Sequence, residues 1–541
     1  MKVLNGKDFK EMVNSGAANL ENYQAEINAL NVFPVPDGDT GTNMSMTFSN
    51  GAKEANGCFS NNIGDVAKAL SKGLLMGARG NSGVITSQIF RGFAQSVEGK
   101  EEVSVADIAE AFENGTRVAY KAIMKPVEGT ILTVIREASW YAHKDYKENN
   151  KMDVNEYFTN LLKHVEVSLN GTPELLPILK EANVVDSGGA GLKRIVEGFV
   201  AYLDGNPVKT NALSVELAKN AQSLFSNEEF GYCTEFILRL KDNYKKDFDE
   251  NILKDKLAKD GESLVLVKDE DLIKVHVHTL HPGDALNMGQ RYGEFVKIKI
   301  ENMQEQHSTL ISENDAAPKK EKKAIGIIAV ASGEGITNLM KELGVDSIIS
   351  GGQTMNPSCN DFLDRISELD NCEKIMIFPN NSNIYLAACQ ARDLVDNKEV
   401  VVIDCMSIQA CLSALARYNP EGSFEDNVKD FNDVCKVVEV ASITYAVKDS
   451  TIDGVTLKEG DYMAMANKNI VANGTDLKEV CHKLFDSIID DNKELVTLIT
   501  GKDSNEEVTN EIVDYIENNT DCEVDVIKGD VPVYYYLIGL E

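Results

Sequence analysis

The chain has 541 residues, of which 43% are hydrophobic and 26% are charged, and its formal net charge at pH 7 is −32. A single hydrophobic core does not support this length, so we expect about three or four domains. The strong negative charge excludes nucleic acid and anionic lipid as partners of the whole chain, because both would be repelled.

Targeting and membrane signals are missing from the sequence. No apolar run is long enough to span a bilayer, and the first residues lack the apolar segment of a signal peptide. The 10 cysteines have no regular spacing, which is typical of reduced thiols in a large intracellular protein. We therefore expect a cytoplasmic protein with no integral membrane segment.

Residues 1–205 have the apolar spacing of helices. In residues 63–76, 104–123 and 154–169, apolar side chains recur at steps of three and four. Runs of β-branched residues, which favour strands, are scarce here. The pattern predicts an all-α domain whose chemistry lies in its loops.

The first loop of this domain reads NVFPVPDGDTGTNM at residues 31–44. Asp37 and Asp39 flank a glycine, so the backbone can turn tightly and aim both carboxylates at one point. Paired carboxylates suit Mg²⁺, which binds through them and through phosphate oxygens. The residues that follow offer hydroxyl, amide and backbone N–H groups to phosphates: Thr40, Gly41, Thr42 and Asn43. If Asp-Gly-Asp is considered without the rest of the chain, the alternative to a metal site is an ordinary solvent-exposed turn.

Three further loops have related chemistry. GARGNSGVI at residues 77–85 opens a helical pattern, so its N–H groups could meet a phosphate at a helix N-terminus, although no Walker lysine follows. KPVEGT ends at Thr130, and NVVDSGGAG covers residues 183–191. Each loop alone also fits an ordinary connection between helices. Four such loops in one helical domain indicate a nucleotide site at one end of a bundle.

Residues 206–310 change to a period of two, typical of strands, at 234–240, 263–267, 273–278 and 296–300. We predict a small α+β domain. His276 and His278 share one face of a strand and, with Cys233, would fill three positions of a tetrahedral Zn²⁺ site. The alternative, a half-buried strand beside an unrelated thiol, stays open at this point. We interpret His281 as a turn residue.

Residues 311–323 are polar and charged and contain a proline, as in a linker. Residues 324–541 begin with apolar strands that alternate with helices, which favours a parallel α/β sheet. Polar loops at 350–358 and 378–383 follow probable strand ends, where ligands usually bind in such sheets. We favour a docking or dimer surface over a ligand site here.

The four loops, in their order and spacing, resemble the nucleotide-binding subunit of the dihydroxyacetone kinase family. Essentially the full length is similar to the ATP-binding subunits of bacterial fatty acid kinases. That resemblance implies a helical-barrel ATP-binding kinase domain, an α+β middle domain and a C-terminal α/β domain of the DegV-like fatty-acid-binding kind.

The resemblance also implies site residues. Asp37 and Asp39 would hold two Mg²⁺ ions that bridge the phosphates of ATP. Asn31 is the nearest candidate for a third aspartate of the family and matches only through an insertion. Phosphate contacts are implied for Thr40, Gly41, Thr42, Asn43, Gly80, Asn81, Ser82 and Gly83. Residues near the nucleotide would be Thr130, Asp186, Ser187, Gly188 and Gly189. The resemblance favours the zinc interpretation, in which Cys233, His276 and His278 form a structural Zn²⁺ site.

In function, the resemblance implies ATP-dependent phosphorylation of the carboxylate of a fatty acid, giving acyl phosphate for phospholipid synthesis. A separate DegV-like fatty-acid-binding protein would present the acid to a homodimer. His143 and His164 fall in helical patterns outside the loops, so direct transfer without a protein nucleophile is simplest.

Two alternatives remain. One is a kinase of a dihydroxyacetone-like polyol that works with a separate substrate-binding protein, and the other is a non-enzymatic nucleotide-binding protein. We expect residues 1–205 to bind ATP and Mg²⁺ as a fragment but to phosphorylate fatty acid poorly without the later regions.

Overall fold

A computed structural model describes the chain except residues 32–37, 124, 211–231, 242–243, 245–247, 249–252, 254–255, 258–260, 270–271, 280, 303–322, 353–354, 453, 468 and 491. Within the strands of the middle region it describes the backbone throughout but only some side chains. The chain forms two compact units. One combines Met1–Asn211 with Lys322–Glu541, and the other is Ala212–Glu321.

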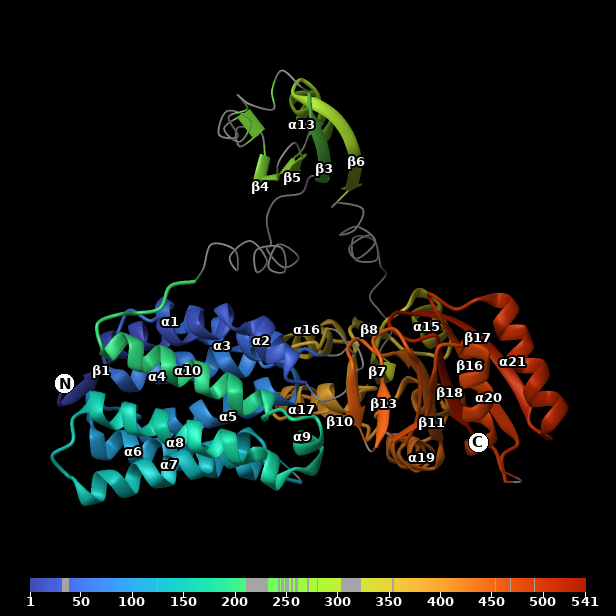
Figure 1. Cartoon of the computed structure of the whole chain (residues 1–541). Helices are drawn as coiled ribbons and strands as arrows, with labels where there is room; N and C mark the ends of the chain where they lie inside the picture. The colour runs from blue at the N-terminus through green and yellow to red at the C-terminus, as the bar shows by residue number, and fades with distance from the viewer. Residues whose placement is uncertain are drawn as a thin grey trace. The chain divides into compact units, whose positions relative to one another are not determined.

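The N-terminal part of the first unit is a closed ring of helices (Figure 1). Each long helix packs beside the next, in the order α1, α3, α4, α5, α6, α7, α8, α10 and back to α1. Its elements are β1 (Val3–Asn5), α1 (Gly6–Asn22), α2 (Gln24–Ala29), α3 (Thr40–Gly57), α4 (Ile63–Met76), α5 (Gly80–Ser96), β2 (Glu102–Ser104), α6 (Val105–Ala122), α7 (Ile131–Glu148), α8 (Val154–Leu175), α9 (Pro177–Glu181) and α10 (Ser187–Leu203). The helical barrel expected from the sequence is therefore confirmed.

Local sequence signals start these helices. Ser104 and Asp107 form a reciprocal capping box at the start of α6, and Asp153 and Glu156 form another at α8. Such pairs satisfy backbone N–H groups that have no partner within the helix. Buried phenylalanines from several helices then contact one another inside the ring, among them Phe48, Phe90 and Phe199. The short antiparallel pair of β1 with β2 is a part of this domain that helical spacing did not predict.

The middle unit is an antiparallel sheet with a helix. Its elements are β3 (Tyr232–Leu240), β4 (Gly261–Asp269), β5 (Leu272–Thr279), α13 (Pro282–Gln290) and β6 (Gly293–Asn302), and the strand order is β4-β5-β3-β6. Alternate residues of β5, including Ile273, Val275 and Val277, are buried. The strands expected at period two are all present, and His281 is the residue before α13.

The C-terminal part of the first unit has two large sheets covered by helices (Figure 1) and a separate two-stranded antiparallel sheet of β12 and β13. The first sheet is wholly parallel, with order β10-β9-β7-β8, as the sequence predicted. The second has order β15-β14-β11-β18-β16-β17 and is antiparallel except between β16 and β17.

The elements of this part are β7 (Lys323–Ala331), α15 (Glu334–Glu342), β8 (Ser347–Ser350), α16 (Cys359–Glu368), β9 (Cys372–Phe378), α17 (Ser382–Arg392), β10 (Glu399–Val402), α18 (Ile408–Ala416), α19 (Phe424–Val437), β11 (Glu439–Tyr445), β12 (Ser450–Ile452), β13 (Val455–Leu457), β14 (Tyr462–Ala466), β15 (Asn469–Gly474), α20 (Leu477–Ile488), β16 (Leu495–Gly501), α21 (Glu506–Asn519), β17 (Glu523–Val531) and β18 (Tyr536–Leu540).

The helical ring and the α/β part share a hydrophobic cluster. Ala78 and Val84, at the start of α5, are buried with Ile349, Phe362 and Ile384 of the α/β part. α17 packs on α5, and α16 packs on α4. Burial of apolar surface therefore fixes the α/β part against the end of the ring at which α5 begins.

Candidate nucleotide and metal site

Four helices of the ring begin at the four loops singled out in the sequence. α3 begins at Thr40, α5 at Gly80, α7 at Ile131 and α10 at Ser187. Contacts between the loops, described below, bring these N-termini to one end of the ring. The starts of α3 and α5 have no side-chain cap, whereas Thr130 caps α7 and Asp186 caps α10. A helix N-terminus carries about half a positive charge, so the uncapped starts of α3 and α5 favour an anion such as a polyphosphate.

Asp39 lies at the start of α3, where its carboxylate is half-buried. Its side chain makes no capping bond to the helix backbone, but it accepts a hydrogen bond from Asn43. Burial raises the pKa of Asp39 to about 6, because removal from water disfavours the ionised form more than this hydrogen bond favours it. A carboxylate removed from water in this way is suited to a divalent cation.

The first loop also joins its neighbours. Thr40 donates to Asn31 Oδ1 over 2.9 Å and accepts a hydrogen bond from Ser187 of the fourth loop over 3.2 Å. Thr42 instead holds α2: its hydroxyl accepts from Gln24 (2.9 Å) and Asn28 (3.0 Å). Thr40 is thus placed between two candidate loops, whereas the contacts of Thr42 fix the α2–α3 packing.

Gly41 has a packing role that motif spacing did not reveal. A Cβ atom added at Gly41 would lie 2.3 Å from the backbone oxygen of Gln24. Any side chain here would push α2 away from α3. Asp37 lies outside the described residues, so its predicted pairing with Asp39 stays a prediction.

The second loop fits closely against α3. Gly80 has φ +59°, and a Cβ there would lie 2.7 Å from Asn43 Nδ2. A Cβ at Gly83 would lie 2.4 Å from Thr47 Oγ1, which also accepts from the backbone N–H of Arg79 over 3.1 Å. Glycine at both positions therefore lets the start of α5 approach the start of α3.

Asn81 and Ser82 stand in the first turn of α5. Asn81 Nδ2 donates to Asn383 of the α/β part over 3.3 Å, and Asn81 Oδ1 is buried with no hydrogen-bond partner among the described residues. The backbone oxygen of Ser82 accepts from Thr86 within the helix. An orphaned amide oxygen beside a helix N-terminus is free for a ligand that carries a donor or a metal-bound water.

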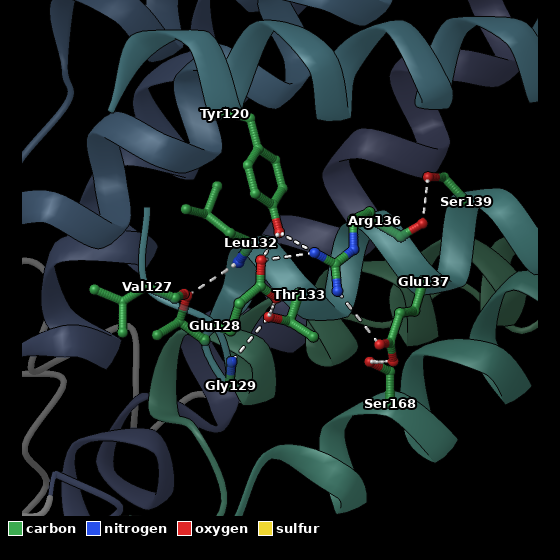
Figure 2. A network of polar contacts seen from close by, with 11 residues as sticks. Tyr120, Val127, Glu128, Gly129, Leu132, Thr133, Arg136, Glu137, Ser139 and Ser168 are labelled. Atoms are coloured by element: carbon green, nitrogen blue, oxygen red, sulfur yellow. Dashed lines mark hydrogen bonds and ion pairs between the residues drawn. The ribbon is translucent and has the colours of Figure 1, made fainter. Parts of the chain in front are cut away.

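The third loop is held by a polar network (Figure 2). Glu128 accepts hydrogen bonds from Thr133 (2.6 Å), Arg136 (2.6 Å) and Tyr120 (3.2 Å). Partial burial raises the pKa of Glu128, but the bonds from Thr133 and Arg136 outweigh it and leave the pKa below its usual value. Thr130 caps α7, because its hydroxyl accepts from the Leu132 N–H and donates to the oxygen of Val127. The network fixes the loop rather than presenting an open ligand site.

The fourth loop is fixed by Asp186. Its carboxylate caps α10 by accepting from the Gly189 N–H over 2.7 Å, and it also accepts from the backbone of Ile131 in α7. Burial raises the pKa of Asp186 to about 6 in spite of these bonds. Gly188 lies against Ile131, where a Cβ would come within 3.2 Å of the Ile131 Cβ. Asp186 therefore joins the third and fourth loops.

The α/β part also reaches this end of the ring. Asn356, in the loop between β8 and α16, donates from Nδ2 to Asp39 Oδ2. Arg79 donates to the backbone oxygen of Asn356 over 2.8 Å and pairs with Asp361 at 3.5 Å. Lys448 donates to the backbone oxygens of Ala29 (3.0 Å) and Asn31 (2.9 Å).

Motif reasoning placed these residues elsewhere. Asn356 lies in a loop that the sequence marked as a docking or dimer surface, and Arg79 was part of a glycine loop. For Asn356, polar character within a loop after a strand was the available signal. It did not say that the loop meets Asp39.

The described residues fit a Mg²⁺–nucleotide complex in part. Asp39 would hold the cation, and the N-termini of α3 and α5 would face the phosphates. Among the residues the structure describes, no three His, Cys, Asp or Glu side chains gather as a metal site. The fit therefore rests on Asp39 and on the orphaned amide oxygens of Asn81 and Asn356.

The three residues of the predicted zinc site lie on paired strands. Cys233 of β3 is directly opposite His278 of β5, and Glu235 is opposite His276. Backbone register therefore brings Cys233 and the two histidines to one end of the sheet. Their side chains lie outside the described ones, so the zinc site stays a prediction.

The polar loops after the strands of the first sheet line a cavity of about 570 Å³. Asn380, Asn383 and Ser332 contribute to its wall, together with apolar residues such as Ile384 and Leu537, and none of the described lining residues is charged. The docking or dimer surface favoured from the sequence stays a prediction, and the structure adds a cavity with polar and apolar walls. That cavity lies beside the loop that carries Asn356, because Met355 also lines it.

The helical ring, with four glycine-containing loops at one end, is the part of the chain that a known kinase-family model describes. The family model named DAK2 domain matches residues 34–201. The models of the FakA-like middle and C-terminal domains, which describe fatty acid kinase subunits, match residues 229–310 and 326–541.

Relatives that match along their full length assign the chain to a narrower family. Protein YloV of Bacillus subtilis is 42% identical over 556 residues, covering 100% of both chains. A Staphylococcus epidermidis protein is 42% identical over 553 residues, covering 99% of both chains. The chain belongs to the FakA-like family of fatty acid kinase subunits.

Two solved structures match parts of the fold. The DegV family protein Cg2579 of Corynebacterium glutamicum matches with a TM-score of 0.32 and 13% identity, over 40% of this chain and 96% of that one. The dihydroxyacetone kinase of C. freundii matches with a TM-score of 0.27 and 20% identity, over 36% of this chain and 34% of that one. Among the described helices, none is both long and apolar enough to cross a bilayer.

Proposed function

We propose that the protein transfers the γ-phosphoryl group of ATP to the carboxylate of a fatty acid that a separate DegV-like protein presents. The observation that carries this proposal is that four helices begin at one end of the ring, near the half-buried carboxylate of Asp39. Family membership supports the kinase class, and the acceptor and the carrier are part of the proposal.

The chain's own residues bind and orient the nucleotide. The free N–H groups at the starts of α3 and α5 receive phosphate oxygens, with Thr40 beside them. Asp39 holds a divalent cation that neutralises charge on the phosphates. Phosphoryl transfer depends mainly on such positioning and charge neutralisation, so a site of this composition suffices.

A carboxylate acceptor needs no base from the protein. Carboxylic acids are ionised at neutral pH, so one carboxylate oxygen attacks the γ-phosphorus while the bond to the β-γ bridging oxygen breaks and ADP leaves. The described histidines of the ring agree with this: His143 pairs with Glu113 (2.8 Å) and His164 with Asp145 (2.7 Å), all in α6, α7 or α8 away from the loops. A polyol acceptor would have to lose a hydroxyl proton.

The direct test uses the full chain with ATP, Mg²⁺ and a DegV-like protein loaded with fatty acid. Hydroxylamine traps acyl phosphate as a hydroxamate, which mass spectrometry identifies. We expect hydroxamate formation that requires ATP, Mg²⁺ and the loaded carrier together. Phosphorylation of dihydroxyacetone with no hydroxamate would instead support the polyol kinase.

We also propose that two Mg²⁺ ions bind near Asp37 and Asp39, with Asn31 as the third position, and that the protein works as a homodimer. The Asn31 side chain accepts from Thr40, so within the first loop it lies next to the start of α3. Structural Zn²⁺ at Cys233, His276 and His278 is supported by the register of β3 and β5.

A further inference from the structure

The loop between β8 and α16 places one amide from the α/β part inside the nucleotide end of the helical ring. The Asn356 residue is 2% exposed, and its Nδ2 donates to Asp39 Oδ2. The two residues are 317 positions apart in the chain. A site built on Asp39 is therefore shared by two parts of the fold.

The orientation of this amide follows from its partner. An ionised carboxylate only accepts hydrogen bonds, so the nitrogen of Asn356 is the atom that binds Asp39 and the oxygen is left for another donor. Asn356 Oδ1 is buried with no hydrogen-bond partner among the described residues. A buried polar atom left unsatisfied destabilises the folded state, so this oxygen is expected to meet a ligand or water in the working protein.

Backbone contacts fix the position of Asn356. Ser358 forms an isolated antiparallel bridge with Arg79, and the Cys359 N–H donates to the oxygen of Ala78 over 3.2 Å. Arg79, which is largely buried, holds the Asn356 backbone oxygen on one side and the Asp361 carboxylate on the other. The loop is thus attached to the start of α5, next to Gly80.

We propose that Asn356 is a positioning residue of the divalent-metal site at Asp39. Its Nδ2 holds the Asp39 carboxylate in place, and its Oδ1 accepts a hydrogen bond from water bound to the cation. Mg²⁺ keeps several of its waters in protein sites, and groups that orient its ligands affect affinity about 10–100-fold. This inference rests on the proposed function in one respect, namely that Asp39 binds the cation.

The consequence concerns the α/β part. Its attachment to the helical ring completes the metal site, so displacement of the loop would lower the affinity for the cation. The α/β part then acts on the nucleotide site itself, in addition to any role in docking a carrier.

The test measures ADP binding to the full chain by calorimetry while Mg²⁺ is varied. Asn356→Leu keeps the shape of the side chain but removes both polar atoms. We expect it to raise the Mg²⁺ concentration for half-maximal ADP binding about 10–100-fold, with near-normal ADP affinity at saturating Mg²⁺. Asn432→Leu is the control, because the Asn432 amide bonds to the backbone of Asp404 and Val428, both within the α/β part and outside this loop.

A second variant guards against loss of the fold. Asn356→Asp removes the donor but adds a negative charge beside Asp39. At pH 8 this variant should therefore need less Mg²⁺ for ADP binding than Asn356→Leu. Without metal, repulsion between the two carboxylates should give it a lower melting temperature than Asn356→Leu. A role in packing alone predicts that both variants weaken ADP binding equally at every Mg²⁺ concentration, and that result would overturn the inference.

The outcomes also separate this inference from the proposed function. If the wild-type chain binds ADP without any dependence on Mg²⁺, the metal assignment of Asp39 fails and the proposed function fails with it. If the wild type depends on Mg²⁺ and Asn356→Leu has the same dependence, only the role of Asn356 is wrong.

Discussion

Asp39 is the residue on which the site depends, and its environment explains why. It lies at a helix N-terminus, accepts hydrogen bonds from Asn43 and Asn356, and is largely removed from water. These groups hold the carboxylate in place without supplying a full positive charge. A divalent cation would supply it.

Replacing Asp39 with asparagine should therefore abolish catalysis and leave the fold intact. Loss of a metal-bridging carboxylate removes several kcal/mol of charge stabilisation, so we expect acyl phosphate formation to fall at least about 100-fold. Asp65→Asn, at an exposed position in the first turn of α4, is the control. Near-normal turnover of Asp39→Asn with unchanged Mg²⁺ dependence would contradict the assignment. We expect the same loss for Asp37→Ala.

The same variant should change how stability depends on pH in the absence of metal. Burial raises the pKa of Asp39 to about 6, whereas the unfolded value is about 3.9. The folded state therefore binds the proton more tightly, and the stability contributed by protonated Asp39 is lost as pH rises from about 4 to about 6. In EDTA at pH 7, Asp39→Asn should be more stable than wild type by up to about 3 kcal/mol.

Urea unfolding at pH 4.5 and pH 7 measures this difference, which should shrink at the lower pH. Asp186 has a similarly raised pKa in both proteins, so it does not affect the comparison. A variant that is less stable than wild type at pH 7 would show that Asp39 is stabilised by a charge partner.

Motif chemistry pointed to loops that the structure brings together, but not to the contacts of each residue. Ser187 of the fourth loop donates to Thr40 of the first, and the nucleotide roles expected for Asp39, Thr40 and Ser187 stay predictions. Thr42 and Gly41 look equally suited to phosphate in the sequence, yet their contacts are with α2. Spacing along a motif does not show which neighbour each residue faces.

At the scale of elements, the start of α5 depends on glycine at position 80. An alanine there would carry the left-handed backbone cost of about 1–2 kcal/mol and would also press on Asn43. Gly99 provides a matched control, because its φ is +73° but a Cβ there meets no atom within 4 Å.

We expect Gly80→Ala and Gly99→Ala to lose similar backbone stability in urea unfolding. Only Gly80→Ala should weaken Mg²⁺–ADP binding, by about tenfold or more, because it displaces Asn43 from Asp39. Equal nucleotide affinity in the two variants would mean that the start of α5 lies outside the site.

The paired strands β3 and β5 carry the zinc prediction. Elemental analysis of protein purified without added metal should find about one Zn²⁺ per chain, since structural sites bind it tightly. Cys233→Ala should lose the metal, whereas Cys58→Ala, at a half-buried thiol in the helical ring, should keep it. If the wild-type protein contains no zinc, or if Cys233→Ala keeps full zinc occupancy, the zinc site is wrong and the three residues are ordinary positions of paired strands.

Elements were predicted from the sequence more completely than their contacts. Residues 63–76 form α4 as expected, and the four strands of the middle region fall where period two placed them, because local spacing encodes both. The order of strands in the second sheet of the α/β part, and the attachment of its β8–α16 loop to Arg79, depend on residues far apart in the chain. The periodicity of apolar residues reports local structure only, so it does not predict such long-range pairing.

At the scale of the molecule, the α/β part changes the expectation for a fragment of residues 1–205. From loop positions alone, this fragment should bind ATP and Mg²⁺ normally. In the structure, truncation would expose Ala78 and Val84 and would remove Asn356 from Asp39 and Asp361 from Arg79. We now expect the fragment to bind ADP but to need about 10–100 times more Mg²⁺, as Asn356→Leu does.

Calorimetry on the fragment and the full chain compares the two expectations. The fragment should also show little carrier-dependent turnover, because the regions expected to hold the carrier are absent. A fragment that matches the full chain in Mg²⁺ requirement, and in acyl phosphate formation at low carrier concentration, would assign no role in the reaction to the later regions.

The most direct measurement of the central claim is acyl phosphate formation by the full chain. The wild-type protein is mixed with ATP, Mg²⁺ and a DegV-like protein loaded with fatty acid, and the product is trapped with hydroxylamine, with Asp39→Asn in parallel. We predict fatty acyl hydroxamate in the wild-type reaction only, in amounts equal to the ADP released. ADP release without hydroxamate, or equal hydroxamate from Asp39→Asn, would contradict a fatty acid kinase that works through Asp39.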